Sequence, residues 1–508
     1  MATAPSGNAP EGAGEAAVVR EAAVAAAPAG HPRMEFALAP EDLPALLRLP
    51  ALQRAGRSAK AELTWHDTPD GAMAGRNQCL CGGDGPWRVE ALYPAPGLAW
   101  APGTPPPVLG TAARPDLLNP PAAQPLAAVA AFRGRRHRLV DDAGLAVTVL
   151  EGHLRGVSAI RGACRVELHG PAAQVAARAA ALGESLHLTV PRASLAAEAA
   201  ALAQGTNPPA RGETLPAVVP GLPLTATVSL VIGGLLDAML HWSATAGDGQ
   251  GPIPVHQMRV ATRRLRSALS IFKGVAACPG VTPLGPALKA TAAALGLARD
   301  WDVFLDGTGA QAAALFPDDR RLQALLAAGR RRRTLAYAGL RTHLAGAPFR
   351  TLTLSLACAA ALRPWEGQDP AQDKLLQADT AGFAAAVLAR RMRQVRHAGR
   401  GLHGLPVAAL HELRKDCKRL RYAAEFFQPL FPERRGRRFI RRLSAVQEAL
   451  GLLNDGAAAA GLLAQLGRAG EGYAAGLVMG VAAAGGGAVR AEVQVAWRKF
   501  RDTHPFWT

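Results

Sequence analysis

The sequence predicts an α+β chain, with a β-rich N-terminal domain followed by an all-α C-terminal domain. Short runs rich in β-branched residues and bounded by turn residues occur between residues 31 and 205, and they predict strands at 146–150 and 164–169 with a helix over 171–182. Helical periodicity prevails from Leu224 to the end of the 508-residue chain. Within the helical part lies a long internal repeat, and this repeat carries most of the functional information.

The repeat joins two segments that are 155 residues apart. His256 opens the pattern H-x-M-R-x-x-x-R-R-L-R-x-A-x-x-x-F, and His411 opens H-x-L-R-x-x-x-K-R-L-R-x-A-x-x-x-F. The same offset aligns residues 295–300 with residues 450–455. Two segments repeated in one register predict a duplicated fold with two basic faces turned toward one polyanion.

Both copies place their basic residues on one side of a helix. At about 100° per residue, the histidine and three cations of each copy fall within roughly 80° of arc. Apolar residues such as Met258, Leu265 and Phe272 occupy the opposite side, as in a core-facing stripe. Neighbouring like charges weaken an isolated helix by a few tenths of a kcal/mol per pair, so the repeated row indicates an anionic partner. A solvated helix face is the alternative interpretation.

The candidate anion-binding residues are the cations and histidines of the two copies: His256, Arg259, Arg263, Arg264, Arg266, His411, Arg414, Lys415, Lys418, Arg419 and Arg421. Each histidine either donates to an anion or packs at the start of its helix. Supporting cations on other segments are Arg330, Arg333, Arg390, Arg393 and Arg396. The acidic residues nearby are expected to pair with arginines rather than bind a metal: Asp300, Asp302 and Asp455.

The excess positive charge is concentrated in the helical part. The whole sequence has 57 Lys and Arg against 39 Asp and Glu, a net charge of +18. Residues 221–508 contain 38 of these cations and 20 of these anions, which accounts for the whole excess. Arginine makes up 32 of the 38 cations, and its planar fork binds phosphate oxygens in pairs. The asymmetry indicates a polyanionic partner for this part of the chain.

Other classes of protein find less support. Six cysteines without a regular framework indicate a reducing, cytoplasmic compartment, and Cys79 and Cys81 form a lone C-x-C without further metal ligands. The apolar run 222–240 contains Pro223 and Asp237, which favours a buried helix over a membrane span. The first residues lack the order of a signal peptide. Known nucleotide-binding and hydrolase motifs are missing, so neither a cofactor nor a catalytic residue is predicted.

Composition divides the chain into four parts. Residues 1–30 are mostly Ala, Gly, Glu and Pro, which predicts a disordered N-terminus. The β-rich domain spans residues 31–205, with a long Pro-rich loop expected over 94–125. Residues 206–222 read as a Pro-rich linker. The helical domain spans residues 223–508, with halves of about 223–365 and 374–508.

The repeated segments resemble the motifs of CHAD domains, the conserved histidine α-helical domains. Residues 256–266 resemble the opening motif of that family, and residues 411–422 resemble its second copy. Residues 295–303 and 447–455 are similar to the two companion motifs. The resemblance covers about residues 223–508, and it implies two pseudo-symmetric four-helix bundles with a basic surface that binds inorganic polyphosphate.

The N-terminal part resembles a CYTH domain, the triphosphate tunnel fold. Residues 34–38 (M-E-F-A-L) stand near its start, and residues 66–70 (H-D-T-P-D) are similar to the family's Y-D-T-P-D. Residues 165–169 (R-V-E-L-H) are similar to the late E-x-E-x-E strand of the family. The resemblance implies a β-rich, tunnel-type domain.

Several functional positions of the CYTH family are changed in this chain. The opening E-x-E-x-K is replaced by Arg33, Glu35 and Ala37, and the late E-x-E-x-E by Arg165, Glu167 and His169. Leu195 follows Ser194 where a lysine is expected, and N-Q-C-L at 77–80 replaces a basic strand. A tunnel triphosphatase needs several carboxylates to hold a divalent metal and cations to hold the phosphates. The changes therefore imply a degenerate scaffold domain.

The sequence thus predicts a polyphosphate-binding protein that is not an enzyme and that associates with polyphosphate granules in the cytoplasm. One alternative is a CYTH-type triphosphatase. Another is a protein that binds the backbone of nucleic acids, because 5% aromatic residues leave few stacking platforms for single strands but do not exclude a duplex. The run Arg133, Arg135, Arg136 and Arg138 is either a residual phosphate contact or a solvated strand end. Neither a membrane partner nor an oligomeric state is predicted.

Overall fold

The structure is a computed structural model that describes residues 31–84, 87–92, 108–112, 126–156, 159–208, 210–214, 217–249, 251–484 and 489–508. The predicted disordered segment 1–30 lies outside these residues. The chain forms two compact units. The first runs to Ala210 and also includes Arg350–Pro364, whereas the second comprises Arg211–Phe349 and Trp365–Thr508. The boundaries drawn from the sequence did not anticipate that Arg350–Pro364 groups with the N-terminal part.

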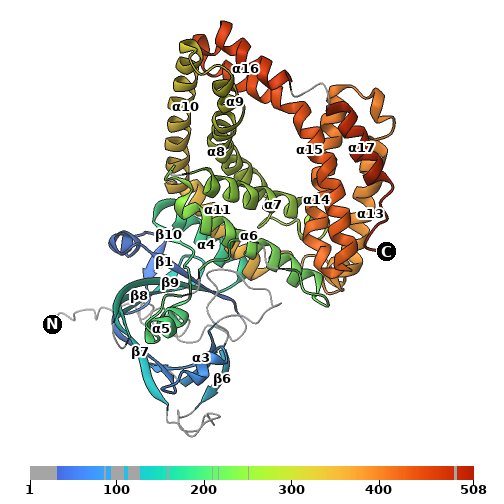
Figure 1. Cartoon of the computed structure of the whole chain (residues 1–508). Helices are drawn as coiled ribbons and strands as arrows, with labels where there is room; N and C mark the ends of the chain where they lie inside the picture. Colours follow the sequence, from blue (N-terminus) through green and yellow to red (C-terminus); the bar gives the residue numbers. More distant parts are fainter. Residues whose placement is uncertain are drawn as a thin grey trace, which may run out of the picture. The chain divides into compact units, whose positions relative to one another are not determined.

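The first unit is built on a ten-stranded sheet whose described neighbours all pair in the antiparallel sense (Figure 1). The strand order is β10-β1-β9-β8-β7-β3-β4-β5-β6, and β2 pairs with β7 outside this path. The strands are β1 Arg33–Leu38, β2 Leu52–Arg54, β3 Ala59–Asp67, β4 Gln78–Gly83, β5 Trp87–Ala91, β6 Val108–Ala112, β7 Ala127–Asp141, β8 Ala146–Arg155, β9 Ile160–His169 and β10 Leu188–Thr189.

Several strands and helices lie where the sequence predicts them. β8 and β9 contain the predicted strands at 146–150 and 164–169, and α4, Ala172–Ser185, is the helix predicted after Pro171. The predicted long loop over 94–125 is wrong at β6, since Val108–Ala112 pairs with β5. The rest of that stretch lies mostly outside the described residues.

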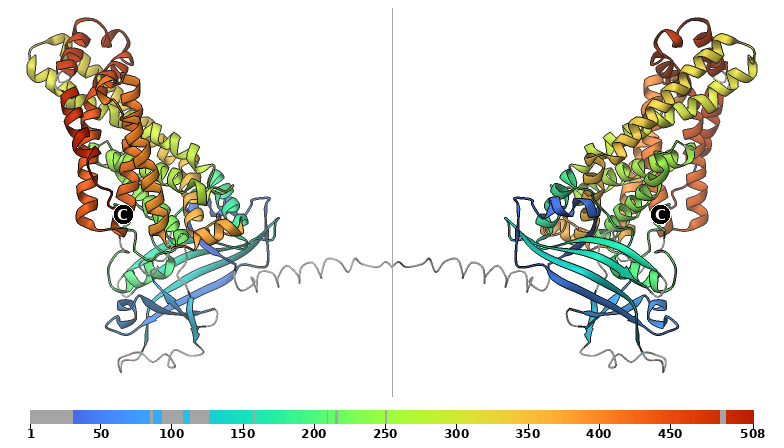
Figure 2. Two further views of the ribbon diagram at one scale, coloured as in Figure 1. Left: turned by 90° about the vertical axis from the view of Figure 1, so that its right-hand side faces the viewer. Right: turned by 90° about the vertical axis from the view of Figure 1, so that its left-hand side faces the viewer.

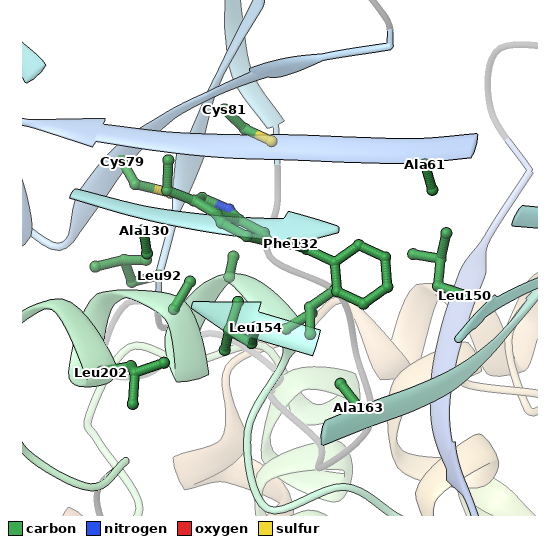
Figure 3. Packing of buried hydrophobic residues seen from close by; sticks show 14 residues of the cluster. Ala61, Cys79, Cys81, Leu92, Ala130, Phe132, Leu150, Leu154, Ala163 and Leu202 are labelled. Atoms are coloured by element: carbon green, nitrogen blue, oxygen red, sulfur yellow. The ribbon is translucent and has the colours of Figure 1, made fainter. Parts of the chain in front are cut away.

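One face of the sheet is covered by α5, Leu195–Ala203, which packs on β3, β7 and β8. Leu195, Ala199 and Leu202 of this helix are buried in one apolar cluster with Phe132 and Leu154 of the strands (Figure 3). Alternation of apolar residues along each strand produces this cluster, because successive side chains of a strand point to opposite faces. The space between α5 and strands β3, β7 and β8 therefore contains an apolar core.

Helix α4 packs against β9 and β10 through Val175, Ala179 and Leu182, which are all buried. The part of α11 (Ala347–Leu362) that belongs to the first unit lies against the C-terminal end of α4. There, Arg350 Nε donates a hydrogen bond to the carbonyl oxygen of Gly183 at 3.0 Å.

The second unit is helical, and Figure 2 shows it from two further sides. The helices of its first half are α6 Leu224–Ala246, α7 Pro252–Ala276, α8 Leu284–Phe304, α9 Ala310–Leu315 and α10 Arg320–Ala345. After the short helix α12, Pro370–Leu376, those of its second half are α13 Thr380–Ala398, α14 Val407–Phe427, α15 Glu433–Ala464, α16 Gly472–Ala484 and α17 Val489–Arg501. Both copies of the repeat are therefore helical, as predicted: the first lies in α7 and the second in α14.

The two halves use corresponding packing orders. In the first half α6 packs on α7, α7 on α8 and α8 on α10. In the second half α13 packs on α14, α14 on α15 and α15 on α17. Helices α7 and α8 of the first half therefore correspond to α14 and α15 of the second half, in agreement with the sequence offset of the repeat.

Two apolar clusters join the halves. In the first, the rings of Phe272 and Phe427, which are equivalent in the repeat, pack edge to face with centroids 6.2 Å apart. Phe383 of α13 completes this cluster at 5.9 Å from Phe272 and 6.3 Å from Phe427. The second cluster gathers residues of α8, α10, α15 and α16, among them Trp301, Leu325 and Val478. The halves are therefore fastened at two separate places.

Helix α6 is long and apolar enough to span a membrane, and most of it is buried inside the structure. Asp237 near its middle accepts hydrogen bonds from Arg211 Nη1 at 2.8 Å and from the backbone N–H of Gly212 at 2.7 Å. The charge of this carboxylate is thereby neutralised inside the protein. The helix acts as a core helix of the second unit.

Candidate functional site

The basic residues of the first repeat lie along one side of α7. We call His256, Arg259, Arg263 and Arg266 the first row. The opposite side of α7 carries Met258, Leu265 and Phe272, which are all buried. Because the apolar stripe is anchored in the core, the row lies on the side of α7 away from that stripe.

The second row lies along α14 and consists of His411, Arg414, Lys418 and Arg421. Leu413, Leu420 and Phe427 on the other side of α14 are buried. The three cations of the row are half-buried, whereas His411 is exposed. The predicted amphipathic pattern is therefore confirmed in both copies.

The two rows meet beside Tyr422 and Glu425 of α14. The guanidinium of Arg263 lies over the Tyr422 ring, 5.2 Å from its centroid, and that of Arg421 lies 5.6 Å from the same centroid. Glu425 accepts a hydrogen bond from Arg264 Nη2 at 2.8 Å and lies 3.4 Å from Arg421 Nε. One aromatic ring and one carboxylate thus hold cations from both repeat copies together.

Lys418 shows how close the rows come. Burial, and after it the positive charges of Arg414, Arg263, Arg259 and Arg421, lower its pKa to about 8. Two of these arginines belong to α7 and two to α14. Like charges at short range disfavour the protonated amine, so this pKa places cations from both rows around one lysine.

His256 lies in a similar electrostatic environment at the start of the first row. Burial lowers its pKa, and Arg299, Arg263 and Arg259 lower it further. The imidazole is therefore neutral at pH 7, with one ring nitrogen as a donor and the other as an acceptor. An anion bound beside it would favour the charged form and so raise this pKa.

Few carboxylates oppose these cations. Asp300 on α8 lies 3.8 Å from Arg259 Nη2 and is itself half-exposed. Glu425 is shared between Arg264 and Arg421. Among the residues that the structure describes, no ion pair is seen for Arg263, Arg266, Arg414 or Lys418. The cluster therefore keeps a net positive charge that an external anion can neutralise.

Several polar atoms in the cluster are buried without a hydrogen-bond partner within the described part of the chain. They are Nε of Arg263, Arg414 and Arg421, Oη of Tyr422 and Oε1 of Gln447. Such groups are destabilising unless water or a ligand pairs with them. Beside them is an open cavity of about 600 Å³ that is lined by Arg414, Arg421, Gln447, Glu448 and Glu492, among others.

Some predicted residues lie away from the point where the rows meet. Lys415 Nζ pairs with Glu412 at 2.8 Å, and Arg419 Nη1 pairs with Asp416 at 2.8 Å, both within α14. Of the supporting cations, Arg330 and Arg333 lie on α10, whereas Arg390, Arg393 and Arg396 lie on α13. These helices pack on the outer sides of α8 and α14. The structure therefore brings together Arg259, Arg263, Arg414, Lys418 and Arg421 of the two rows and leaves these others apart.

The acidic residues of the companion motif act as expected where the structure describes them. Asp302 is buried and accepts hydrogen bonds from Arg333 Nε at 2.6 Å and from the Tyr337 hydroxyl at 2.9 Å. Arg333 also lies over the Tyr337 ring at 4.6 Å. This network joins α8 to α10, so Arg333 stabilises the packing of these two helices. The side chains of residues 452–458, which include Asp455, lie outside the described part.

Glu425 is the site residue that the sequence reasoning missed. In the first repeat copy the positions equivalent to Tyr422 and Glu425 are Ser267 and Ser270. This departure from the repeat was visible in the sequence and marks the place where one copy contacts the other. Positions at which two copies of a repeat differ are thus candidates for the joint between them.

The first unit contains a second ionic cluster, which is buried. Glu35 accepts hydrogen bonds from Arg165 Nε and from the backbone N–H of Leu195, both at 3.0 Å. Arg165 Nη2 also donates to Glu198 of α5 at 2.6 Å. Burial raises the pKa of Glu35 to about 7, although the positive charge of Arg165 opposes the shift. The side chains of Glu35, Arg165 and Glu198 are therefore paired with one another inside the first unit.

The basic run of β7 is also paired locally. Arg133 lies 3.0 Å from Glu62, Arg136 lies 3.0 Å from Asp84, and Arg135 donates to the Ser58 hydroxyl at 3.1 Å. Throughout the described residues, no group of three or more His, Cys, Asp or Glu side chains is suited to hold a metal ion. Arg133, Arg135 and Arg136 therefore each have a polar partner inside the first unit.

The enclosed position of Lys418 predicts a change of stability with pH. Its pKa of about 8 in the folded protein lies below the ordinary value of 10.5, so between these values only the unfolded chain keeps the proton and rising pH stabilises the fold. Lys418→Met removes this group, so the variant should be more stable than the native protein at pH 7 and lose its advantage toward pH 10. The difference in the free energy of unfolding between the two proteins should shrink by about 1–2 kcal/mol from pH 7 to pH 10. The effect is no larger because solvent screens a half-buried group.

Urea unfolding of both proteins at several pH values measures this gap. Buried thiols such as Cys417, whose pKa burial raises to about 12, make the fold less stable as pH rises. Both proteins contain these thiols, so their contribution cancels when the two free energies of unfolding are compared. The exposed Lys289 of α8 supplies the matched control, Lys289→Met, which makes the same substitution away from the two rows. A gap that stays constant for Lys418→Met would contradict the close approach of the two rows.

Comparisons with known proteins agree with the repeat motifs. Residues 231–464 match the family model of the CHAD domain. The CHAD domain from the plant Ricinus communis is 27% identical, over 56% of this chain and 96% of that chain, with a TM-score of 0.49. PptA from Streptomyces chartreusis is 17% identical, over 55% of this chain and 99% of that chain, with a TM-score of 0.40. No curated protein matches the chain. The family match shows that this chain contains a CHAD domain over residues 231–464.

Proposed function

We propose that this protein binds inorganic polyphosphate along the two basic rows of its CHAD domain. The observation that carries the proposal is the convergence of Arg259 and Arg263 of the first row with Arg414, Lys418 and Arg421 of the second. The resemblance to the family points to the same ligand. The site therefore consists of two rows that act as one.

The chemistry of the rows suits a linear chain of phosphates. Polyphosphate offers only negative charge and acceptor oxygens, so it is recognised by the spacing of donors and cations rather than by the edges of bases. Arginine forks bind phosphate oxygens in pairs, and the neutralised phosphates release counterions into the solution. Within the described part of the chain, the buried Nε atoms of Arg263 and Arg414 have no hydrogen-bond partner, which is consistent with an external acceptor. A binding role of this kind would attach the protein to polyphosphate granules.

The first unit is proposed to be a scaffold derived from a CYTH domain, without hydrolase activity. Arg165 stands where that family has a glutamate, and it neutralises Glu35 and Glu198. α5 and its apolar neighbours fill one face of the sheet. A metal-dependent triphosphatase needs free carboxylates and an open polar site. The pairing with Arg165 argues against free carboxylates, and the apolar cluster under α5 argues against an open polar site.

Neutralising either row should abolish most of the affinity for long polyphosphate. The two triple variants are Arg259→Gln with Arg263→Gln and Arg266→Gln, and Arg414→Gln with Lys418→Gln and Arg421→Gln. Each should also flatten the plot of log Kd against log salt, by about one unit for every phosphate that the variant no longer binds. Fluorescence titration with end-labelled polyphosphate at several salt concentrations measures both effects.

The matched control for these variants removes the same charge from the first turns of α15. It replaces Arg434, Arg435 and Arg438, which are exposed there, and it should bind almost as tightly as the native protein. Circular dichroism should remain helical for all variants, because the altered residues lie opposite the apolar stripes. If one row proved dispensable, with unchanged Kd and salt slope, the repeat would have a single working face.

Competition with duplex DNA separates polyphosphate binding from general binding to nucleic-acid backbones. At equal phosphate concentration, polyphosphate should displace DNA, because a flexible chain can follow rows on two helices whereas a duplex with a persistence length of about 50 nm cannot. Equal displacement by both polymers would favour the nucleic-acid alternative.

The full-length protein should not hydrolyse triphosphate in the presence of magnesium or manganese. The reason is the internal pairing of Glu35 and Glu198 with Arg165. A phosphate-release assay on the purified protein checks this expectation. Robust turnover that disappears in the variant Glu35→Gln/Glu167→Gln would show that the first unit is a working enzyme.

A further inference from the structure

Two equivalent glycines lie directly beside the arginines that open the two rows. Gly296 of α8 and Gly451 of α15 are 155 residues apart, the offset of the repeat. A Cβ atom added at Gly296 would lie 3.0 Å from Arg259 Nη1, and one added at Gly451 would lie 3.4 Å from Arg414 Nη2. In both halves a guanidinium therefore rests on helix backbone that a side chain would otherwise cover.

Backbone conformation does not account for these glycines. Both lie inside regular α-helices, and neither has the positive φ angle that favours glycine. Glycine is a poor helix former because it loses more conformational freedom on folding than other residues. Gly285 of α8 and Gly461 of α15 have open space where a Cβ would be, so they lie on the same two helices without meeting an arginine.

The position of the Arg259 guanidinium matters to the second row. From Gly296 it extends toward Asp300, one helical turn further along α8, at 3.8 Å. Its charge is also felt by Lys418 on α14. A guanidinium lifted off α8 would change its distance from Asp300 and from the cations of the second row.

We propose that Gly296 and Gly451 are positioning residues that seat the guanidinia of Arg259 and Arg414 against α8 and α15 and thereby set the spacing of the phosphate-binding cations. This inference rests on the proposed function. It assigns the two glycines a role through the arginines and not through direct contact with the ligand. The shorter distance at Gly296 makes the first half the more sensitive of the two.

The experiment compares Gly296→Ala and Gly451→Ala with the controls Gly285→Ala and Gly461→Ala. Gly296→Ala should weaken binding of long polyphosphate roughly threefold to tenfold, because charge-assisted hydrogen bonds are weakened rather than abolished. Gly451→Ala should weaken it less, and the two controls should bind like the native protein. The thermal midpoint should not fall in any of the four, because alanine is the better helix former.

A double-mutant cycle shows whether the glycine acts through the arginine. Arg259→Ala alone should weaken binding, and adding Gly296→Ala to it should have no further effect. Native affinity in Gly296→Ala, or an equal loss with and without Arg259, would overturn the positioning role while leaving polyphosphate binding intact. A native protein that does not bind polyphosphate would instead overturn the proposed function and this inference with it.

Discussion

Repulsion among the cations of α7 and α14 is the constraint that the second unit has to overcome. Burial and the charges of four neighbouring arginines lower the pKa of Lys418 to about 8. Among the described residues, Asp300 and Glu425 are the carboxylates that pair with cations of the two rows. The fold keeps them together through interactions placed elsewhere. Phe272, Phe427 and Phe383 join the halves at one place, and the cluster around Trp301 joins them at another. Apolar burial thus stabilises an arrangement that electrostatics alone would open, and a bound polyanion would relieve it.

The two repeat copies contribute different parts to this arrangement. Both supply a row of cations, a glycine beneath the first arginine and an apolar stripe that ends in a phenylalanine. Only the second copy supplies Tyr422 and Glu425, which hold Arg263, Arg264 and Arg421 at the junction. Only the second copy has a lysine in its row, and this row lines the cavity beside Gln447. Duplication therefore explains the shared geometry, and divergence of the copies explains how they fasten to each other.

Much of the second unit could be predicted because its apolar residues recur at helical spacing and its motifs repeat along the sequence. The spacing of Met258, Leu265 and Phe272 predicts the buried side of α7, and the offset of 155 residues transfers that prediction to α14. Contacts between elements distant in the sequence could not be predicted in this way. Glu425 and the pairing of Asp302 with Tyr337 depend on how helices cross, and Arg350–Pro364 groups with the first unit through tertiary packing. In the first unit, the departures from the CYTH motifs that the sequence resembles were visible, but the pairing of Arg165 with Glu198 was not.

The central claim is that both rows bind one chain of phosphates, and the length dependence of binding tests it most directly. Affinity should be measured for polyphosphates of graded, narrow length at constant ionic strength. A chain that reaches only one row binds as a single site, whereas a chain that reaches both gains the effective concentration of linked sites. The account predicts a steep rise in affinity up to the length that spans both rows and a shallow dependence beyond it. A rise that is merely proportional to the number of phosphates, without such a step, would contradict the joint action of the two rows.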